Sequence, residues 1–258
     1  TESVGFRHFE FIENGPFRLN GERLLLRGTH RHDDHAGVSA AMTEEQMEAE
    51  MKLIKEMGVN FIRLGHYQQS DIILRLCDQL GILVWEEIPW CRGGLGGEKY
   101  QAQARRMLTN MITQHHNHPS VILWGLGNEN DWPNDFSTFE QSAIRAFMKE
   151  LNDLSHQLDP SRMTSIRRCD FCNDIVDVYS PSIWAGWYRG QFTDYKSISE
   201  NEMKRVKHFL HVEWGGDSHA GRHSEYPFNP LQAITSGNSA DERAGDFALQ
   251  GGDPRASR

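Results

Sequence analysis

The sequence predicts an α/β protein of the (β/α)8 TIM-barrel class, with about seven of the eight strands present in this chain. Two observations favour this class. Short apolar runs alternate with amphipathic segments along the 258 residues, a pattern typical of parallel strands joined by helical crossovers. Polar side chains also follow nearly every apolar run. A barrel gathers such strand ends around one mouth, whereas an open sheet spreads them along a line.

The strands are expected where apolar residues run with few polar interruptions, because parallel strands are covered on both faces. In chain order, they are residues 24–28, 61–64, 82–87, 121–127, 163–168, 175–180 and 208–214. Histidines follow the first two strands, and glutamates stand at or just beyond the ends of the third, fourth and seventh.

The helices between these strands have recognisable ends. Thr43 and Gln46 match a capping box at the start of the first helix, and Gly58 ends that helix. Ser70 caps the second helix, which ends at Gly81. Further helices are expected at about residues 99–115 and at about 199–206. Between them, a helix that stops at Asp159-Pro160 carries apolar residues at helical spacing, namely Phe147, Leu151, Leu154 and Leu158.

The two ends of the chain do not fit a barrel. Residues 1–23 are expected to be the end of a preceding β-sandwich domain and a linker, and the barrel is expected to occupy residues 24–228. Residues 229–258 are polar and rich in glycine. We expect them to form a loop-rich segment that leads toward a missing eighth strand.

The composition excludes several classes of protein. A net charge of −9 argues against nucleic acid or anionic lipid as the main partner. No apolar run approaches the ~20 residues of a membrane span. Four cysteines do not make a disulfide framework, and we interpret Cys169 and Cys172 as structural. The sequence predicts a soluble protein and leaves the compartment open between periplasm and cytoplasm.

Two glutamates carry the most informative chemistry. Glu129 ends the apolar run VILWGLGNE, and Glu213 lies at the end of the run HFLHVEWGG. Carboxylates presented at the same end of a sheet are the minimum requirement for cleaving a glycosidic bond. One carboxyl gives a proton to the leaving oxygen while the other attacks the anomeric carbon or activates water.

Five motifs in this order, LLLRGTHRH, NFIRLGHY, ILVWEEIP, NHPSVILWGLGNE and HVEWGG, resemble the catalytic barrel of glycoside hydrolase family 2. The resemblance covers roughly residues 15 to 225. It implies a retaining double displacement in which Glu129 is the acid/base and Glu213 the nucleophile. We expect Arg63 to keep Glu213 ionised. We also expect the pKa of Glu129 to be raised by its negative neighbour and by aromatic walls such as Trp124 or Trp214.

The resemblance also implies contacts to the sugar. Asn128 matches the family asparagine that binds the sugar 2-hydroxyl, with a polar cap of the strand as the alternative. His32 and His66 match histidines that touch sugar hydroxyls, with fold support or a metal site as the alternatives. We expect no metal, because no matching distant ligand pair stands out. Trp184 stands where relatives often have a tyrosine. We expect Trp184 to donate a hydrogen bond there or to stack on a sugar face, with packing in the core as the alternative.

The expected function is removal of terminal β-linked sugars by a β-D-galactosidase, because EWGGDSHAGRH resembles galactan-degrading enzymes. The alternatives are a β-glucuronidase or β-mannosidase of the same family, a sugar-binding fragment without catalysis, and more distantly a metallohydrolase. We expect a carbohydrate substrate, no nucleic acid or membrane partner, and a possible homo-oligomer of the full-length protein. No cofactor is expected, although some relatives use accessory magnesium.

Overall fold

The computed structural model describes residues 4–133 and 135–215, which belong to two compact units. The first unit comprises Thr1–Pro181 and Val206–Val212, and the second comprises Ser182–Arg205 and Glu213–Arg258. Both sheets and helices α1 to α4 lie in the first unit. The described part of the second unit contains a short 3-10 turn at Phe192–Asp194 and helix α5.

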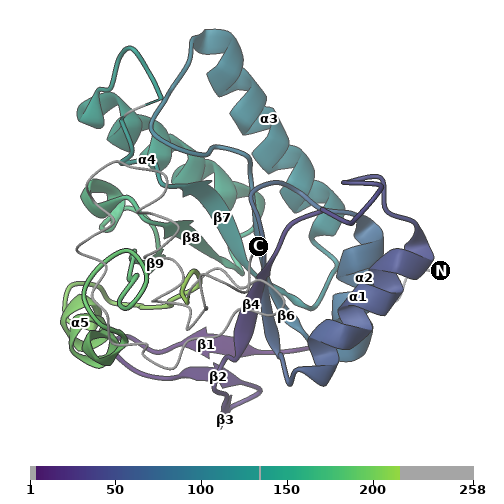
Figure 1. Ribbon diagram of the computed structural model, residues 1–258. Helices are drawn as coiled ribbons and strands as arrows, with labels where there is room; N and C mark the ends of the chain where they lie inside the picture. Colours follow the sequence, from purple (N-terminus) through teal and green to yellow (C-terminus); the bar gives the residue numbers. More distant parts are fainter. Residues whose placement is uncertain (1–3, 134, 216–258) are drawn as a thin grey trace, which may run out of the picture. The chain divides into compact units, whose positions relative to one another are not determined.

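A curled sheet of six parallel strands is the framework of the first unit, in the order β4-β5-β6-β7-β8-β9. Helices α1 to α4 lie along the outer face of this sheet (Figure 1). The strands are β4 (Gly28–Arg31), β5 (Phe61–Leu64), β6 (Leu83–Glu87), β7 (Val121–Asn128), β8 (Met163–Arg167) and β9 (Val178–Ser180). The helices are α1 (Glu44–Glu56), α2 (Asp71–Leu80), α3 (Glu98–His115) and α4 (Gln141–Leu158). The parallel order and the outer helices confirm the barrel class.

The first predicted strand is displaced toward the carboxyl end of the chain. The Asn60 side chain donates to the carbonyl of Leu25 at 2.9 Å and accepts from the amide of Arg27 at 2.7 Å. These bonds occupy the backbone before the ladder with β5 begins at Gly28. The expectation of a strand over residues 24–28 was therefore wrong in position, because side-chain bonds take the place of ladder bonds there.

The seventh predicted strand, residues 208–214, is not a full strand in the part of the chain that the structure describes. It makes one parallel bridge, between Tyr179 and Phe209. The amide of Tyr179 donates to the carbonyl of His208 at 3.0 Å, and the amide of Leu210 donates to Tyr179 at 3.2 Å. The segment thus follows β9 in the expected direction.

Local sequence signals fix the helix ends. The capping box is confirmed, since the Gln46 amide donates to Thr43 Oγ1 at 3.3 Å and the Thr43 amide donates to Gln46 Oε1 at 2.8 Å. Gly81 ends α2 with a left-handed φ of 64°, which glycine adopts without steric cost. Helix α5 (Tyr195–Met203) begins four residues earlier than expected. The preceding turn, closed by Asp194, leads the chain directly into this helix.

Three short antiparallel strands precede the barrel: β1 (Phe9–Phe11), β2 (Phe17–Leu19) and β3 (Glu22–Arg23). Their phenylalanine rings stack at centroid distances of 6.3 Å for Phe9 and Phe17 and 4.9 Å for Phe11 and Phe17. These rings pack on Phe61 and other inward residues at the amino ends of the barrel strands. We call this three-stranded sheet the floor. Residues 1–23 were expected to hold one strand and a linker, and the domain boundary at residue 23 stays a prediction.

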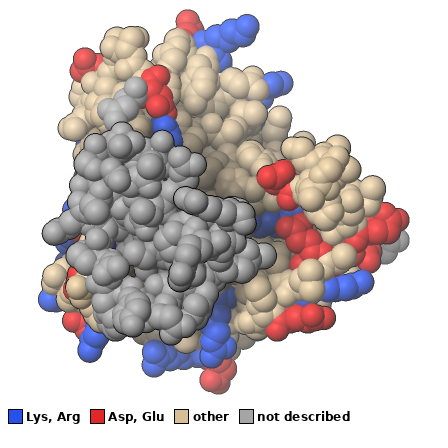
Figure 2. Space-filling view, viewed as in Figure 1, with Lys and Arg blue, Asp and Glu red and all other residues tan. Residues whose placement is uncertain are grey.

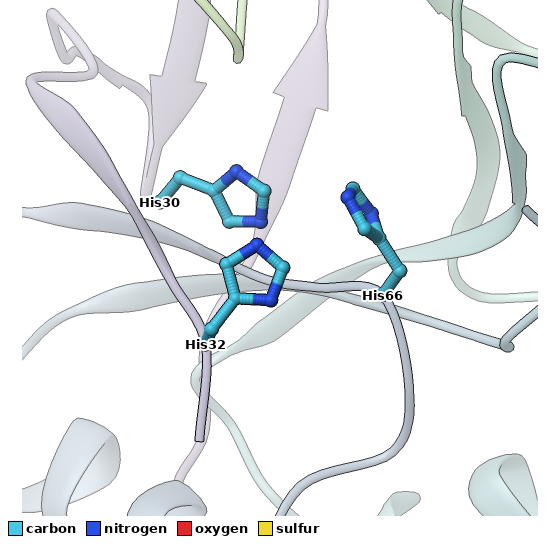
Figure 3. A group of neighbouring side chains, drawn as sticks. All are labelled: His30, His32 and His66. Carbon is cyan, nitrogen blue, oxygen red and sulfur yellow. The ribbon is translucent and has the colours of Figure 1, made fainter. Parts of the chain in front are cut away.

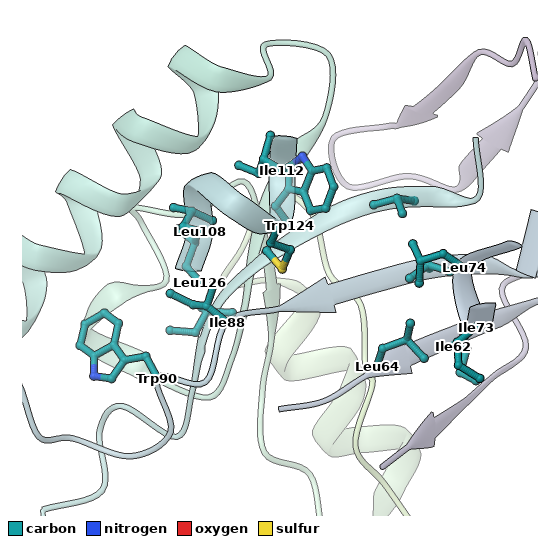
Figure 4. Packing of buried hydrophobic residues seen from close by; sticks show 14 of the residues in the cluster. Ile62, Leu64, Ile73, Leu74, Ile88, Trp90, Leu108, Ile112, Trp124 and Leu126 are labelled. Atoms are coloured by element: carbon teal, nitrogen blue, oxygen red, sulfur yellow. The ribbon is translucent and has the colours of Figure 1, made fainter. Parts of the chain in front are cut away.

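Side chains alternate between the two faces of each strand, and this alternation positions the site. On β5, Ile62 and Leu64 face outward into the core under the helices, which Figure 4 shows from close by. Phe61 faces inward at the amino end, and Arg63 faces inward at the carboxyl end. Strand β6 repeats this order, from inward Leu83 to inward Glu87. The interior is therefore apolar at the floor and polar at the mouth.

Acidic and basic side chains are interspersed over the described part of the face shown in Figure 2. Within residues 4–133 and 135–215, no helix has the length and apolar character needed to cross a membrane.

Candidate active site

A buried ion pair forms the base of the site. Arg63 donates through Nε to Glu87 Oε2 and through Nη2 to Glu87 Oε1, both at 2.9 Å. Both side chains are fully buried. Burial opposes ionisation of Glu87, but Arg63 and His66 outweigh it and hold the pKa of Glu87 below its ordinary value. Glu87 is thus a fixed negative charge beneath the mouth.

Three further groups surround this pair. Trp85 Nε1 donates to Glu87 Oε2 at 2.8 Å, and His66 Nδ1 lies 2.5 Å from Glu87 Oε1. Asn128 Oδ1 accepts from Arg63 Nη2 at 2.8 Å. The side chain of Asn128 is thereby oriented at the end of β7, one residue before Glu129. The structure brings together five of the residues expected in the site, namely His32, Arg63, His66, Asn128 and Glu129.

The backbone around Glu129 is tightly held. The Glu129 amide donates to the carbonyl of Arg167 on β8 at 2.9 Å, and its own carbonyl accepts from the amide of Trp132 at 2.9 Å. Glu129 has a left-handed φ of 55°, and so do Arg92 at 66° and Arg168 at 51°. Such conformations are uncommon for residues other than glycine and persist where surrounding contacts enforce them. Glu129 and two of the arginines near its carboxyl thus share this feature.

Arginines surround the carboxyl of Glu129. Arg167 Nη1 donates to Glu129 Oε1 at 2.6 Å, Arg168 Nη1 lies 3.4 Å from the same oxygen, and Arg92 Nε lies 3.7 Å from Oε2. Burial raises the pKa of this carboxyl, but Arg167 and the two other arginines outweigh burial and hold the pKa below its ordinary value. The expectation of a raised pKa is wrong for this arrangement, because arginines adjoin the carboxyl.

The aromatic wall expected from Trp124 is also absent from this carboxyl. Trp124 faces the opposite side of β7, in the core beneath the helices. Its Nε1 donates to the buried carboxylate of Asp159 at 2.9 Å. Strand alternation explains the difference, since Trp124 lies on the face opposite to inward Asn128.

Three imidazoles lie together above the ion pair, and we call His30, His32 and His66 the histidine cluster. Their possible ligand atoms all lie within 4.8 Å of one another. Figure 3 shows a ring nitrogen of His30 and one of His32 facing each other, with the His66 ring beside them. Burial and the charge of Arg63 lower the pKa of His30 to about 2, so this ring is neutral. Polar rings at the mouth suit contacts to hydroxyl groups.

Two predicted site residues belong to the second unit. The ring of Trp184 meets that of Tyr188 edge-on at 5.4 Å. Glu213 lies in the same unit. The convergence of Glu213 with Glu129, the pairing of Glu213 with Arg63 and the contact of Trp184 with sugar therefore stay predictions.

Sequence reasoning did not single out Glu87 or Arg167 as site residues. Each of these residues stands at or next to the end of a predicted strand. Because alternate side chains of a strand face the same side, Glu87 lies on the same inward face as Trp85, two residues earlier. The neighbouring Glu86 faces outward, where its Oε2 meets His115 Nδ1 at 2.7 Å. This contact gives His115, at the end of α3, a structural role.

The cysteine pair expected to be structural is buried. Cys169 and Cys172 are free thiols within the core beneath the helices. The hydrogen bond with Cys172 and burial raise the pKa of Cys169, so the thiol form prevails.

Comparisons with known proteins agree with this geometry. The family model "Glycosyl hydrolases family 2, TIM barrel domain" matches residues 11–231. A crystal structure of Parabacteroides merdae β-glucuronidase superposes with a TM-score of 0.85 and 79% identity, covering 87% of this chain and 29% of that one. Bacteroides uniformis β-glucuronidase 3 superposes with a TM-score of 0.84 and 74% identity, covering 86% of this chain and 28% of that one.

A more distant relative is a β-galactosidase of Thermoanaerobacterium thermosulfurigenes. It is 37% identical over 178 residues, which are 68% of this chain and 23% of the relative. The chain thus spans less than a third of the length of each of these three proteins.

Proposed function

This chain belongs to glycoside hydrolase family 2, and from that premise we propose that the natural protein is a retaining β-glycosidase that removes β-linked glucuronic acid. The observation that carries the choice of sugar is the 79% identity to a β-glucuronidase at a TM-score of 0.85. The β-galactosidase relative is only 37% identical. The earlier preference for a galactoside is therefore not confirmed.

In the proposed reaction, Glu129 protonates the glycosidic oxygen while Glu213 bonds to the anomeric carbon and the leaving alcohol departs. Water then attacks that carbon, Glu129 takes the proton of the water, and the carboxylate of Glu213 is released. The position of Glu129 at the end of β7, with its backbone bonded to β8, supports this role. The hydrogen bond from Arg63 that orients the side chain of Asn128 supports the proposal that Asn128 contacts the sugar.

The protonation of Glu129 must change during this cycle. Arg167 favours the ionised form, which is the form needed to accept a proton from water in the second step. The first step needs the protonated form. We propose that the negative charge of Glu213 opposes Arg167 in the free site and that formation of the covalent bond removes this charge.

The test is a panel of nitrophenyl β-glycosides with the complete natural protein. We expect the glucuronide to be hydrolysed at least tenfold faster than the galactoside or mannoside, as kcat/KM. Preferential turnover of the galactoside would instead support the specificity first expected from the sequence. Absence of turnover on all three would contradict the proposed activity.

Two substitutions separate the roles of the carboxylates. Glu213→Gln should abolish turnover of every substrate, because no nucleophile remains. Glu129→Ala should lose far more activity on substrates with poor leaving groups than on a dinitrophenyl glycoside, whose leaving group needs no proton. The matched control is Glu56→Gln on the exposed face of α1. Equal losses for both leaving groups in Glu129→Ala would contradict its role as acid.

A further inference from the structure

The histidine cluster combines ligands from two neighbouring strands. His30 lies on β4, His32 follows that strand directly, and His66 lies two residues past β5. The ring centroids are 4.6 Å apart for His30 and His32, and 5.1 Å from each of these to His66. Three imidazoles are a ligand set that suits Zn²⁺ and related transition metals.

One nitrogen of the cluster lacks the partner that a buried polar atom ordinarily has. His30 Nε2 is buried and makes no hydrogen bond with any residue in the described part of the chain. A buried polar atom without a partner is costly unless a ligand, ion or water satisfies it. This observation points to a bound species, and it is independent of the spacing of the three rings.

His66 carries a second feature of metal-binding histidines. Its Nδ1 lies 2.5 Å from Glu87 Oε1 and 3.2 Å from Arg63 Nη2, and the shorter contact, to an acceptor, favours the tautomer with the proton on Nδ1. The lone pair then lies on Nε2, the nitrogen left for a ligand. A carboxylate behind a histidine fixes the ring orientation and makes the ligand more basic, as in many zinc sites.

The local backbone and charge are compatible with a cation. A Cβ atom at Gly65 would lie 2.6 Å from His30 Nε2 and 2.8 Å from Glu87 Oε1, so a larger residue at position 65 would displace these two side chains. The positive charge of Arg63 is offset by Glu87 in the buried pair. Glu87 also supplies a negative charge directly beside His66, one of the three rings.

We propose that His30, His32 and His66 bind one Zn²⁺ ion, with water in the remaining coordination position. Zinc–nitrogen bonds of about 2.0–2.1 Å require the nitrogens to lie closer together than the 4.8 Å limit of the cluster. Binding of the ion therefore requires the three rings to move closer together. Because His32 and His66 are also the expected sugar contacts, the ion blocks the sugar site. This second consequence rests on the proposed function.

Binding is measured first, without reference to activity. Titration of the chelator-treated natural protein with ZnCl₂ in a calorimeter should give one ion per chain. His30→Gln and His32→Gln should each weaken the association at least tenfold. His32 is exposed, so its replacement tests the site even if His30→Gln does not fold. The matched control is His8→Gln, whose side chain is 71% exposed and lies outside the cluster, and it should bind zinc like the wild type.

Zinc binding that is absent, or unchanged in both cluster variants, would overturn the proposal. The inhibition arm then follows. Zn²⁺ should inhibit hydrolysis of the preferred nitrophenyl glycoside competitively, and His30→Gln should raise the inhibition constant at least tenfold. If the protein binds one zinc ion per chain but hydrolyses no glycoside, the proposed metal site is supported and only the proposed function is overturned.

Discussion

Arg63 and Glu87 form two parallel hydrogen bonds across adjacent strands, with both side chains completely enclosed. The register explains the pairing, because Arg63 lies beside Trp85 in the ladder and Glu87 is the next inward residue on β6. The pair fixes the orientation of Asn128 and His66 through direct hydrogen bonds. Positioning and stability thus depend on the same two charges.

Arg63→Met should destabilise the protein by roughly 3–5 kcal/mol, because it leaves Glu87 buried without its cation. The measurement is the free energy of unfolding from urea denaturation. The comparison is Glu150→Gln, which removes the exposed Arg105–Glu150 pair and should cost about 1 kcal/mol or less. Equal losses of unfolding free energy in the two variants would show that the buried Arg63–Glu87 pair contributes no more to stability than the exposed pair.

Arg168→Gln should shift the alkaline limb of the kcat/KM profile to higher pH. Removal of a cation near Glu129 raises the pKa of this carboxyl, so its proton-donating form persists at higher pH. Arg167→Gln should shift the limb further, because Arg167 makes the shorter contact. The exposed Arg205→Gln serves as control. An unchanged limb in both arginine variants would argue against Glu129 as the titrating acid.

Asp159→Asn should destabilise the protein by roughly 1–3 kcal/mol near neutral pH. Burial opposes ionisation of Asp159, but bonds from Ser161, Trp124 and Arg162 hold its pKa well below the ordinary value. The folded pKa is thus below the unfolded one. This contribution is complete above the unfolded value of about 3.9 and is lost as the pH falls below it.

The measurement for this prediction is the difference in unfolding free energy between wild type and Asp159→Asn at several pH values. We expect the difference to shrink on acidification. The same series with exposed Asp153→Asn is the control. A difference that grows toward low pH would contradict the assigned sign.

Gly125→Ala should distort the site from beneath. A Cβ atom at this position would lie 2.4 Å from Glu87 Cβ and 2.5 Å from Trp85 Nε1. We expect a loss of roughly 1–3 kcal/mol in stability and reduced kcat/KM. Gly97→Ala is the control, because a Cβ there meets nothing within 4 Å. Normal activity of Gly125→Ala would mean that the Glu87 network tolerates displacement.

Local signals in the sequence were sufficient for most helices. A capping box at Thr43 and a glycine at position 81 act within a few residues, so no tertiary knowledge is needed to place them. The first barrel strand was misplaced because Leu24 and Leu26 are apolar for another reason. They pack onto the interior cluster at the floor rather than continuing the parallel ladder.

Contacts between strands were beyond such reasoning. The pairing of Arg63 with Glu87 depends on the register of β5 and β6, which strand patterns alone do not determine. The lowered pKa of Glu129 likewise depends on Arg167, which reaches it from the next strand. His66 was expected to touch sugar, but its position beside His30 depends on the pairing of β4 with β5.

The floor has a practical consequence for protein engineering. The phenylalanines that precede the first barrel strand cover the base of the barrel. Glu129 and the histidine cluster lie at the opposite end of the strands. Loops at the rim can therefore be exchanged to alter substrate selectivity without changing the floor. A barrel moved into another protein should include the floor at residues 9–23. A segment that begins at Leu24 would expose the apolar residues at the base of the barrel and would be expected to aggregate.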